Sequence, residues 1–451
     1  MKDKKIVVCL KYFKGELNPF DGAALECALE TGAEVAVVAM APLSVLPMLK
    51  TLTRLGVSAV LISDPMFAGS DTQATSYILS ETIKRLSPDF VFCGRQSVDG
   101  DTAQVPPMLA QRLGYSFLSG VMKIDNQTFL TRAGTSVTRQ NHSVIAFEKA
   151  KTLRFPSIFS KEKEVQVWDN GFLKLEKEKC GLLGSPTRVI KSYESSVGRR
   201  DCQFVEKEKL FSLLEESLQK QRLERTFTTN EKLNEVYYVG NVKAIAEQIA
   251  KEVIQLEIEN KSAEELALEV QGKTVLWEDS ESLKVLASKV AVLTGAGICA
   301  DCISFRVERG KLIMTRPALG GNVTADIVCQ NDMTFATVRT VKANGADVIF
   351  SVGKGGIEYI EKITMLAEEY NAEVCCSRIV ADSGRLPYEK QVGLTGRTVC
   401  PKTYVAFGIS GAVQHTCAIE GAGTVIAVNT DKNARIFDYA DYGIIADIKD
   451  L

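Results

Sequence analysis

Several features that would place a protein in a membrane, on nucleic acid or outside the cell are missing from this chain of 451 residues. It has no run of about 18 apolar residues, which a membrane-spanning helix requires. Its formal net charge is -2, without the basic surplus of nucleic-acid binders or a like-charge tail. The N-terminus enters a strand-like run directly, without the apolar segment and cleavage site of a signal peptide. We therefore expect a cytoplasmic protein with no membrane span and no nucleic-acid partner.

Regular cysteine spacing is also missing, and histidine is scarce. The twelve cysteines are scattered, which indicates reduced thiols rather than a disulfide framework. Cys299 and Cys302 form a C-x-x-C pair, but no second pair or nearby histidine completes a zinc site, so we expect no bound metal. One of only two histidines, His415, ends a glycine-rich stretch, QVGLTGRTVCPKTYVAFGISGAVQH.

The chain does have an alternation of strand-like and helical segments. Apolar residues make up 45% of it, enough to build a core. Short β-branched runs are separated by amphipathic stretches in the N-terminal part, as in KIVVCLKYF, EVAVVAMAP, SAVLIS and DFVFCG. This pattern predicts a parallel sheet with helices on both faces. One of these helices is expected to begin at Asp71 or Thr72, which can cap it.

The alternation of strand-like and helical segments is interrupted in the middle of the chain. TFLTRAG, SVTRQN and SVIAFEK predict antiparallel strands, and SKEKEVQVWDNGFLKLEKEKCG predicts a charged, extended arm. Residues 203–235 are helix-prone and charged, which favours a solvated linker helix. Alternation resumes near Val236, where YYVGN, KTVLWE and VAVLTG are expected as strands, and a last unit begins near Ala346.

We therefore predict an α/β protein of two fused nucleotide-binding-type parallel-sheet modules plus a C-terminal Rossmann-like domain. The expected domains are residues 1–200, with an extended arm, 201–345, with a linker helix and a truncated module, and 346–451.

Polar residues and glycines follow several expected strand ends in the C-terminal domain. Ligands of open α/β sheets bind beyond the carboxyl ends of the strands, so these positions share one rim. They are Lys354, Ser377, Arg378, Ser410 and Asn429. Gly408 and Gly411 allow close backbone approach, and the helix expected after them favours an anionic ligand. Taken singly, a buried histidine, a surface salt bridge and turn glycines have ordinary explanations; their gathering on one rim favours a site.

A second candidate site lies in GRQSVDGDTAQVPPMLAQRLG, from Gly94 to Gly114. A strand is expected to end at Cys93 and a helix to start near Thr102 or Ala103, capped by Asp101 or Thr102. The same amides can hold a phosphate. Asp99 and Asp101 fit ribose hydroxyls or backbone amides better than a phosphate, and two aspartates alone are weak support for magnesium. A helix cap alone and a nucleotide site both stay open.

Long blocks of this sequence resemble the electron-transferring flavoproteins, with their β and α subunits fused in that order. The α-like blocks are TRPALGGNVTAD, SRIVADSGRLP, QVGLTGRTVCPKTYVAFGISGAVQH, IAVNTD and ARIFDYADYGIIAD. The β-like blocks are NPFDGAALECAL, LISDPMFAGSDTQAT and GRQSVDGDTAQVPPMLAQRLG. The resemblance covers most of the chain and is weakest from about 200 to 290.

The resemblance implies an FAD in the C-terminal domain. Thr395 should lie near flavin N5, Arg378 over the isoalloxazine ring, and His415 at the N1–C2=O edge. A cation or donor at that edge stabilises the charge that collects there on reduction. The other cofactor-binding positions carried over are Lys354, Ser377, Gln391, Val392, Gly393, Leu394, Gly396, Ser410, Gly411, Ala412, Val413, Gln414, Asn429, Asp447 and Ile448. No residue is assigned a catalytic role.

The resemblance also implies a second nucleotide in the β-like domain, either AMP or a second FAD. The string DGDTAQV is similar to the electron-bifurcating members of the family and favours a second FAD; a single-FAD carrier with structural AMP is the alternative. The contacts carried over for either nucleotide are Cys9, Asn18, Pro19, Phe20, Asp21, Met40, Gly94, Arg95, Gln96, Ser97, Val98, Asp99, Gly100, Asp101, Thr102, Ala103, Gln104 and Val105.

The function implied is electron transfer between a dehydrogenase, such as an acyl-CoA dehydrogenase or a similar flavoenzyme, and a redox acceptor. If the protein bifurcates electrons, NADH is the donor, ferredoxin or flavodoxin is an acceptor, and only then is oxidoreductase activity expected. RFPSIFSKEKEV is similar, in shortened form, to the segment that presents an anchor to partner dehydrogenases. A non-redox adenine-nucleotide-binding module is the least favoured alternative, because it has no reason to keep Arg378, Thr395, Gln414 and His415 together.

Overall fold

The computed structural model describes residues 1–139, 141–194, 199–219, 229–321, 323–339, 346–393 and 396–451. The contacts divide the chain into two compact units. The first comprises Met1–Lys191, Thr229–Leu319 and Ala325–Val338, and the second comprises Ser192–Thr228, Gly320–Thr324 and Arg339–Leu451. This division differs from the expected boundaries, because residues 192–228 group with the C-terminal domain and not with the middle module.

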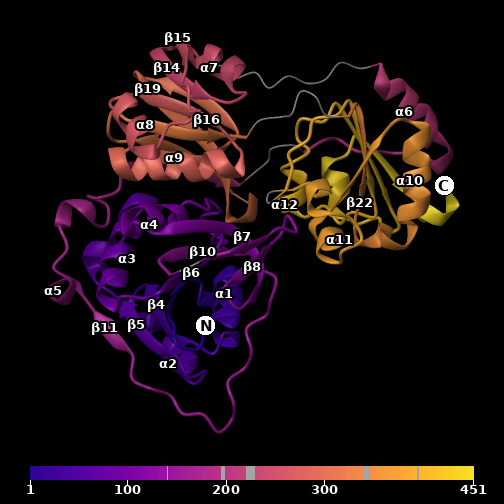
Figure 1. The fold of residues 1–451 in the computed structure, drawn as a ribbon. Coiled ribbons are helices and arrows are strands. Elements are labelled where there is room, and N and C mark those ends of the chain that lie inside the picture. The colour runs from indigo at the N-terminus through magenta and orange to yellow at the C-terminus, as the bar shows by residue number, and fades with distance from the viewer. Residues whose placement is uncertain (140, 195–198, 220–228, 322, 340–345, 394–395) are drawn as a thin grey trace. The chain divides into compact units, whose positions relative to one another are not determined.

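The first unit begins with a sheet of strand order β11-β5-β4-β1-β6-β10-β7-β8-β9 (Figure 1). The strands are β1 (Lys5–Leu10), β4 (Glu34–Met40), β5 (Ser58–Ile62), β6 (Phe90–Gly94), β7 (Ser116–Asp125), β8 (Thr128–Thr131), β9 (Ser136–Thr138), β10 (Ser143–Phe147) and β11 (Gln166–Trp168). The predicted parallel core is confirmed by the β5-β4-β1-β6 pairings. Strands β8 and β9 are antiparallel as predicted, but β10 (SVIAFEK) was expected to be antiparallel and instead pairs parallel with β6 and β7.

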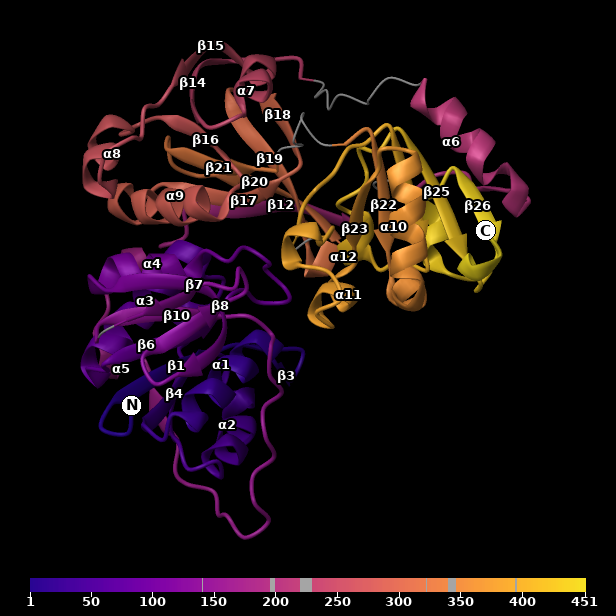
Figure 2. The same cartoon turned by 45° about the vertical axis from the view of Figure 1, so that its right-hand side comes forward.

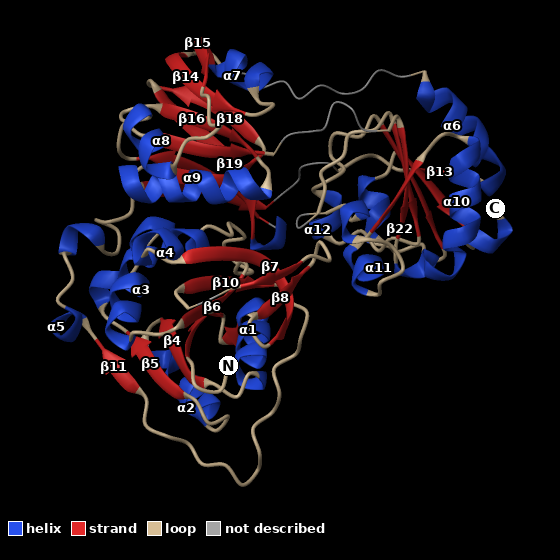
Figure 3. Ribbon diagram, in the orientation of Figure 1, coloured by secondary structure: helices blue, strands red, loops and turns tan. Residues whose placement is uncertain are grey.

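Helices cover both faces of this sheet, as the alternation predicted (Figure 3). Helices α1 (Pro19–Glu30) and α2 (Leu46–Thr53) bury Leu25 and Leu49 in one apolar cluster. Helices α3 (Thr72–Leu86) and α4 (Val105–Leu113) bury Ile78 and Leu109 in another. A short hairpin of β2 (Tyr12–Phe13) and β3 (Glu16–Leu17) follows β1.

Two helix starts test the capping predictions. Asp71 caps α3 by accepting from the Gln73 and Ala74 N–H groups at 2.9 and 3.1 Å, which confirms that prediction. Helix α4 begins at Val105, and its N-cap residue Gln104 makes no side-chain cap bond. The helix start expected near Thr102, with a cap from Asp101 or Thr102, is therefore wrong; two prolines follow Val105, and proline is best tolerated in the first turn of a helix.

The segment predicted as a charged, extended arm forms part of the first unit. Strand β11 extends the sheet beside β5 and is followed by α5 (Asn170–Leu173). At the start of β12 (Thr187–Glu194), the Thr187 N–H and Oγ1 donate to Asp71 Oδ2 at 3.0 and 2.7 Å. The aspartate that caps α3 thus also anchors the end of this segment.

The first unit also contains the middle module, a parallel sheet of order β15-β14-β16-β21-β17. Its strands are β14 (Leu233–Val239), β15 (Ala250–Gln255), β16 (Thr274–Glu278), β17 (Gly297–Cys302) and β21 (Thr334–Val338). Strands β18 (Ser304–Glu308), β19 (Lys311–Ala318) and β20 (Val323–Cys329) form a further sheet in the order β12-β20-β19-β18. The two strands predicted around the glycine turn of GKLIMTRPALGGNVTADIVC are β19 and β20, so that prediction is confirmed.

The helices of this module are α7 (Lys243–Ile249), α8 (Ala263–Glu269) and α9 (Glu281–Thr294). VAVLTG was predicted as a strand, but its first residues lie in α9. The reason is that Ala287, Val290 and Ala291 recur at helical spacing and bury one helix face. A short apolar run does not by itself distinguish a strand from a buried helix turn.

The second unit is a parallel sheet of order β13-β26-β25-β24-β22-β23 (Figure 2). Its strands are β13 (Gln203–Phe204), β22 (Val348–Val352), β23 (Glu373–Cys376), β24 (Thr403–Phe407), β25 (Thr424–Asn429) and β26 (Tyr442–Ile445). Its helices are α6 (Leu210–Leu218), α10 (Ile360–Glu369), α11 (Arg378–Asp382) and α12 (Val413–Thr416). Strands β22 to β26 have the 2-1-3-4-5 order of a doubly wound nucleotide-binding fold, which confirms the predicted fold class. Across the described ranges, no helix is both long and apolar enough to cross a bilayer.

Helix α6 corrects the prediction of a solvated linker helix. Leu210 and Leu214 are fully buried in one cluster with Val348 and Phe350 of the second unit. Ser217 Oγ also hydrogen-bonds Thr403 Oγ1 of β24. The charged residues that suggested a linker lie on the outer face, while the leucines of the other face complete the core.

We predict that Leu214→Ala lowers the free energy of unfolding by about 2–5 kcal/mol, because it leaves a cavity in a closed core. Denaturant unfolding followed by circular dichroism measures the change. Glu215→Ala on the exposed face of the same helix is the matched control and should leave stability nearly unchanged. Equal, small effects of both substitutions would restore the linker interpretation.

Candidate nucleotide and flavin sites

A cavity of about 360 Å³ opens at the carboxyl ends of β22, β23 and β24. Strand β22 lies between β23 and β24, so the strand order reverses there and the flanking connections leave on opposite faces of the sheet. Residues directly after each strand line the cavity, including Gly353, Ser377 and Gly408. The single rim that the sequence predicted is thus present in the second unit.

Two glycines allow the loops of this rim to touch. A Cβ on Gly353 would lie 2.3 Å from the Gly408 carbonyl oxygen, and one on Gly408 would lie 2.5 Å from Gly356 N. Gly408 also has a φ of +61°, in the left-handed region. Any side chain at either position would push the loops apart, so the cavity floor depends on bare backbone.

His415 lies in this cavity, and burial decides its charge. Its Nε2 is 2.7 Å from Tyr404 Oη, and only 6% of its surface is exposed. Burial lowers the pKa of His415 from 6.5 to about 4, and the neighbouring Val392 backbone opposes this shift only in part. His415 is therefore neutral at pH 7. Of the two roles that the sequence left to it, cation and donor, this environment supports the donor.

The remaining polar groups of the cavity fit a large polar cofactor such as FAD. Among the described residues, Ser377 Oγ and His415 Nδ1 are buried without a hydrogen-bond partner of good geometry. Buried polar atoms of this kind are normally satisfied, so a bound ligand is their natural partner. Arg378 is a third exposed and pairs with Asp382 at 3.3 Å, and Lys354 lies at the rim. Two cations and two neutral groups suit an anionic diphosphate joined to a flavin.

The structure brings together most of the predicted FAD-site residues. Those that line the cavity are Lys354, Ser377, Arg378, Gln391, Val392, Gly393, Ser410, Ala412, Gln414 and His415. Those outside the lining are Gly396, Gly411, Val413, Asn429, Asp447 and Ile448. Leu394 and Thr395 lie outside the described residues. Gly408, which the sequence predicted as a point of close backbone approach, also lines it. Gly353, Ile379 and Ile409 line it as well and were not predicted; their places after strand ends and in the first turn of α11 were the available signal.

Some predicted residues outside the lining have other partners. Asn429 Nδ2 donates to the Ile409 carbonyl at 2.9 Å and so supports the cavity wall from behind. Asp447 accepts from the Lys449 N–H at 3.0 Å and caps the last turn of the chain. At Gly411, whose φ is +84°, a Cβ would lie 2.0 Å from Ile436 N. Asn429 and Gly411 thus contact backbone next to the cavity, whereas Asp447 caps a turn at the end of the chain.

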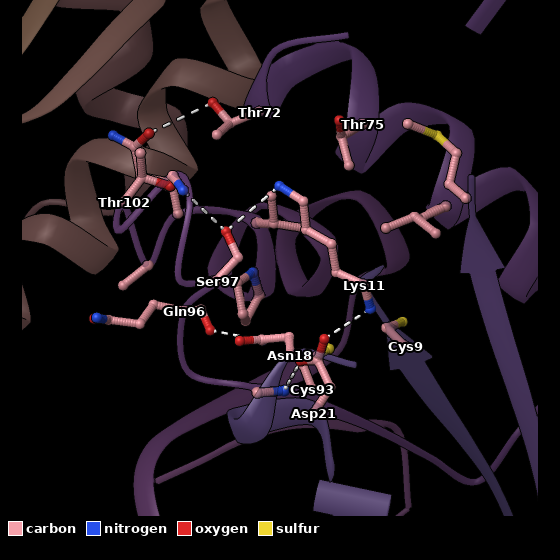
Figure 4. A pocket seen from close by; sticks show the side chains of 18 of the residues that line it. Cys9, Lys11, Asn18, Asp21, Thr72, Thr75, Cys93, Gln96, Ser97 and Thr102 are labelled. Atoms are coloured by element: carbon pink, nitrogen blue, oxygen red, sulfur yellow. Dashed lines mark hydrogen bonds between the residues drawn. The ribbon is translucent and has the colours of Figure 1, made fainter. Parts of the chain in front are cut away.

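A second cavity, of about 400 Å³, lies in the first unit at the carboxyl ends of β1, β4 and β6 (Figure 4). Strands β1 and β6 are neighbours, and the chain order of the parallel strands reverses between them. This is again the position where open α/β sheets bind ligands. Helices α3 and α4 begin at its edge with Thr72 and Val105.

Asp21 forms part of the floor of this cavity. It accepts the Lys11 N–H at 2.7 Å and the Gly94 N–H at 3.0 Å, which ties the ends of β1 and β6 together. Burial raises the pKa of Asp21 to about 7, although its hydrogen bonds favour the carboxylate. A Cβ on Gly94 would lie 2.3 Å from Asp21 Oδ1, so this glycine is required for the contact.

The loop between β6 and α4 has an unusual backbone. Asp101 and Ala103 have φ values of +51° and +53°, which are costly for residues other than glycine. Asp101 is buried and accepts from Gln96 Nε2 at 3.0 Å. In the described chain, the N–H groups of Thr102, Ala103, Gln104 and Val105 donate to no other residue. Alternating backbone conformations and free amides at a helix start form an anion-binding concavity.

The side chains at this cavity also fit a nucleotide. Asn18 Oδ1 and Gln104 Nε2 are buried without a hydrogen-bond partner among the described residues. Lys11 Nζ lies 2.7 Å from Asp99 Oδ2 and, although burial opposes the shift, holds the pKa of Asp99 below its usual value. Asp99 is thus paired with a lysine, and nothing in this arrangement requires magnesium. No group of metal-ligating side chains occurs in the described ranges.

Most of the predicted contacts line the cavity: Cys9, Asn18, Asp21, Met40, Gly94, Arg95, Gln96, Ser97, Gly100, Thr102, Ala103, Gln104 and Val105. Pro19, Phe20, Val98, Asp99 and Asp101 do not. The prediction missed Leu10, Lys11, Phe67, Gly69, Ser70, Asp71, Thr72, Thr75, Leu79, Cys93 and Pro106. The start of α3 was the available signal, because a capped helix directly after β5 had to begin at the same sheet edge.

The fold is that of an α/β protein with two cavities at positions where open α/β sheets bind ligands. The electron transfer flavoprotein domain model matches residues 6–160 and 244–364, and the electron transfer flavoprotein FAD-binding domain model matches residues 342–420. These matches cover more than half of the chain, which belongs to the electron transfer flavoprotein family. An FAD-binding domain of that family therefore contains the cavity around His415.

Relatives resemble both subunits of such flavoproteins. The chain is 32% identical over 234 residues to an electron transfer flavoprotein subunit alpha of Thermoanaerobacterium thermosaccharolyticum, covering 42% of this chain and 71% of the relative. It is 35% identical over 192 residues to the subunit beta of the same organism, covering 39% and 74%. It is also 35% identical over 205 residues to the acryloyl-CoA reductase electron transfer subunit beta of Anaerotignum propionicum, covering 34% and 56%.

We predict that His415 does not titrate between pH 5.5 and 8 in the oxidised protein, because burial keeps its pKa near 4. Proton NMR with labelled histidine measures this, and His142→Gln identifies the remaining signal. As pH falls from 6.5 to about 4, the His415 ring binds a proton in the unfolded chain but stays neutral in the folded one. This linkage removes about 3 kcal/mol of stability.

His415→Asn is the control for that loss, and it should reduce the acid destabilisation by a similar amount. A histidine signal that titrates near pH 6.5 would show that the ring is charged in the folded protein.

Proposed function

We propose that this chain is a single-chain electron carrier in which an FAD at the second unit's cavity passes electrons between a partner dehydrogenase and a redox acceptor. The observation that carries the proposal is the presence, in one chain, of two cavities at strand-order reversals and of matches to both subunits of one organism's flavoprotein. The bound FAD supplies the redox chemistry, and the protein supplies its position and its electrostatic surroundings.

The chain's own groups have distinct tasks in this proposal. Gly353 and Gly408 bring backbone close to the cofactor, and the rim cations Lys354 and Arg378 face its negative charge. Tyr404 bonds His415 Nε2, so a Tyr404 O–H that donates leaves the proton on Nδ1, which has no hydrogen-bond partner of good geometry among the described residues. A neutral donor at that position stabilises charge without carrying any itself.

For the first unit's cavity we propose an adenine nucleotide, with its phosphate on the amides of residues 102–105. The string DGDTAQV favours a second FAD, and with it electron bifurcation from NADH to two acceptors, one of them ferredoxin or flavodoxin. The alternative occupant is a structural AMP, which makes the protein an ordinary single-electron carrier. Both occupants contain the same AMP moiety, so the buried Asn18 and Gln104 side chains support either.

We predict two FAD per chain. Acid release of the cofactors from the purified protein, followed by chromatography, counts flavin and AMP against protein. One FAD and one AMP per chain would rule out the second flavin and with it bifurcation. Absence of flavin would favour the non-redox nucleotide-binding module.

We further propose that the loop around RFPSIFSKEKEV docks the dehydrogenase. Phe155, Ile158 and Phe159 are 95%, 84% and 87% exposed, which is unusual for large apolar side chains so close together in the chain. The loop is anchored on both sides of them. Arg154 pairs with Glu26 at 2.6 Å, and Arg54 donates to the Ser157 and Ser160 carbonyls at 3.0 and 3.2 Å. An apolar tip on a fixed base is suited to insertion into a partner pocket.

We predict that Ile158→Ser combined with Phe159→Ser lowers kcat/KM with an acyl-CoA dehydrogenase as electron donor by about tenfold or more, because the anchor residues of an interface dominate its affinity. FAD content should not change. Leu268→Ser, a residue that is 78% exposed on α8 of the same unit, is the matched control. An equal effect of the control would mean that the loop has no special role.

A further inference from the structure

Arg316 of β19 is a buried arginine whose contacts are made with backbone carbonyls. It is only 4% exposed. Its Nε donates to the Ala300 carbonyl at 2.8 Å, and its Nη1 donates to the Gly100 carbonyl at 2.6 Å. Nη2 has no hydrogen-bond partner in the described part of the chain. Gly100 belongs to the loop that lines the first unit's cavity, while Arg316 is 216 positions further along the chain.

Arg316 has no compensating carboxylate among the described residues, since no acidic side chain lies within salt-bridge distance of it. Burying a cation without a counter-charge is unfavourable, and two carbonyl contacts offset this only in part. The neighbouring Arg306 shows the usual solution, because it pairs with Asp326 at 2.9 Å and Glu308 at 2.6 Å. The burial of Arg316 is therefore not explained by a favourable contribution to folding stability.

Arg316 joins two backbone segments, and both are irregular. At one end, the β17–β21 ladder is interrupted between Cys299 and Cys302, and Asp301 has a φ of +57°. At the other end is the loop with left-handed Asp101 and Ala103. Unfavourable dihedral angles persist only where the surrounding contacts enforce them. Arg316 supplies such a contact to both segments at once.

A second bond from the same strand end supports the loop. The Leu319 N–H, just after β19, donates to the Asp99 carbonyl at 3.1 Å. Two successive carbonyls of the loop, those of Asp99 and Gly100, are thus held from outside the cavity by the β19 end. The amides that follow them, at residues 102–105, are the ones left free to face the cavity.

We propose that Arg316 is a positioning residue for the nucleotide site: it holds the loop of residues 97–103 in the conformation that presents its amides to a phosphate. Arg316 is not among the residues that line the cavity. The consequence is a specific one. Loss of Arg316 weakens recognition of the phosphate, while recognition of the adenosine part is retained. This inference rests on the proposed adenine nucleotide in the first unit's cavity.

The test compares AMP with adenosine. Full-length protein is freed of nucleotide at this cavity by dialysis, and both ligands are titrated by calorimetry. Arg316→Met should weaken AMP binding by about 10- to 100-fold, the size of one lost charge-assisted hydrogen bond. Adenosine binding should change by less than about twofold. Arg316→Lys, which keeps the charge and can reach one carbonyl, should recover part of the AMP affinity.

Arg306→Met is the matched control. It removes a better-paired arginine from the adjacent strand β18, so it destabilises the same sheet without touching the loop. Its AMP and adenosine affinities should match those of the unchanged protein. Hydrogen exchange adds a local readout, because residues 97–105 should exchange faster in Arg316→Met while α3, on the other wall of the cavity, stays protected.

The outcomes distinguish failure of the proposed nucleotide binding from failure of the positioning role of Arg316. If the unchanged protein binds neither AMP nor FAD at this cavity, the proposed nucleotide function fails. If the unchanged protein binds AMP, two results contradict the positioning role but not the nucleotide function. In one, Arg316→Met binds AMP with unchanged affinity; in the other, its affinities for AMP and for adenosine fall by the same factor. If Arg316→Met does not fold, Arg316→Lys decides by the same comparison of AMP with adenosine.

Discussion

The structure depends on one topological constraint, that parallel strands bring all their carboxyl ends to the same edge of a sheet. Where the strand order reverses, the connections leave on opposite faces and a crevice stays open between them. This happens beside β1 and β6, beside β22 and β24, and also beside β14 and β16 of the middle module. The two cavities described above occupy the first two of these positions, so each follows from the strand order of its sheet.

Burial then determines the charge of the groups at these edges. His415 is held neutral at pH 7 and the pKa of Asp21 is raised to about 7, because desolvation disfavours their charged forms. The cations act differently at the two sites. Lys354 and Arg378 stand at the rim of one cavity, whereas Arg316 lies behind the loop of the other and acts through a peptide carbonyl. In our proposals, the cations of one cavity attract the cofactor directly, and the cation of the other positions backbone.

Much of the fold could be predicted because local patterns and topology agreed. The alternation of KIVVCLKYF, EVAVVAMAP and SAVLIS with amphipathic stretches predicted β1, β4 and β5, and Asp71 identified the start of α3. The failures have a common cause. VAVLTG, SVIAFEK and the leucines of α6 are short apolar segments whose type, pairing or burial depends on which distant residues cover them. Of the ten predicted FAD-site residues that line the cavity, Lys354, Ser377, Arg378 and Ser410 follow strand ends, a property visible along the chain. The other six were implied by the family resemblance.

The sequence by itself determined the α/β class, the glycines that allow backbone approach and the family blocks that imply FAD. These properties are local, since a strand end, a glycine and a motif are each read within a few residues. Only the tertiary structure decided the protonation of His415, the place of α6 in the core and the contact between Arg316 and Gly100. Each of these depends on groups that lie far apart in the chain, and burial and hydrogen bonding between such groups exist only once the chain has folded.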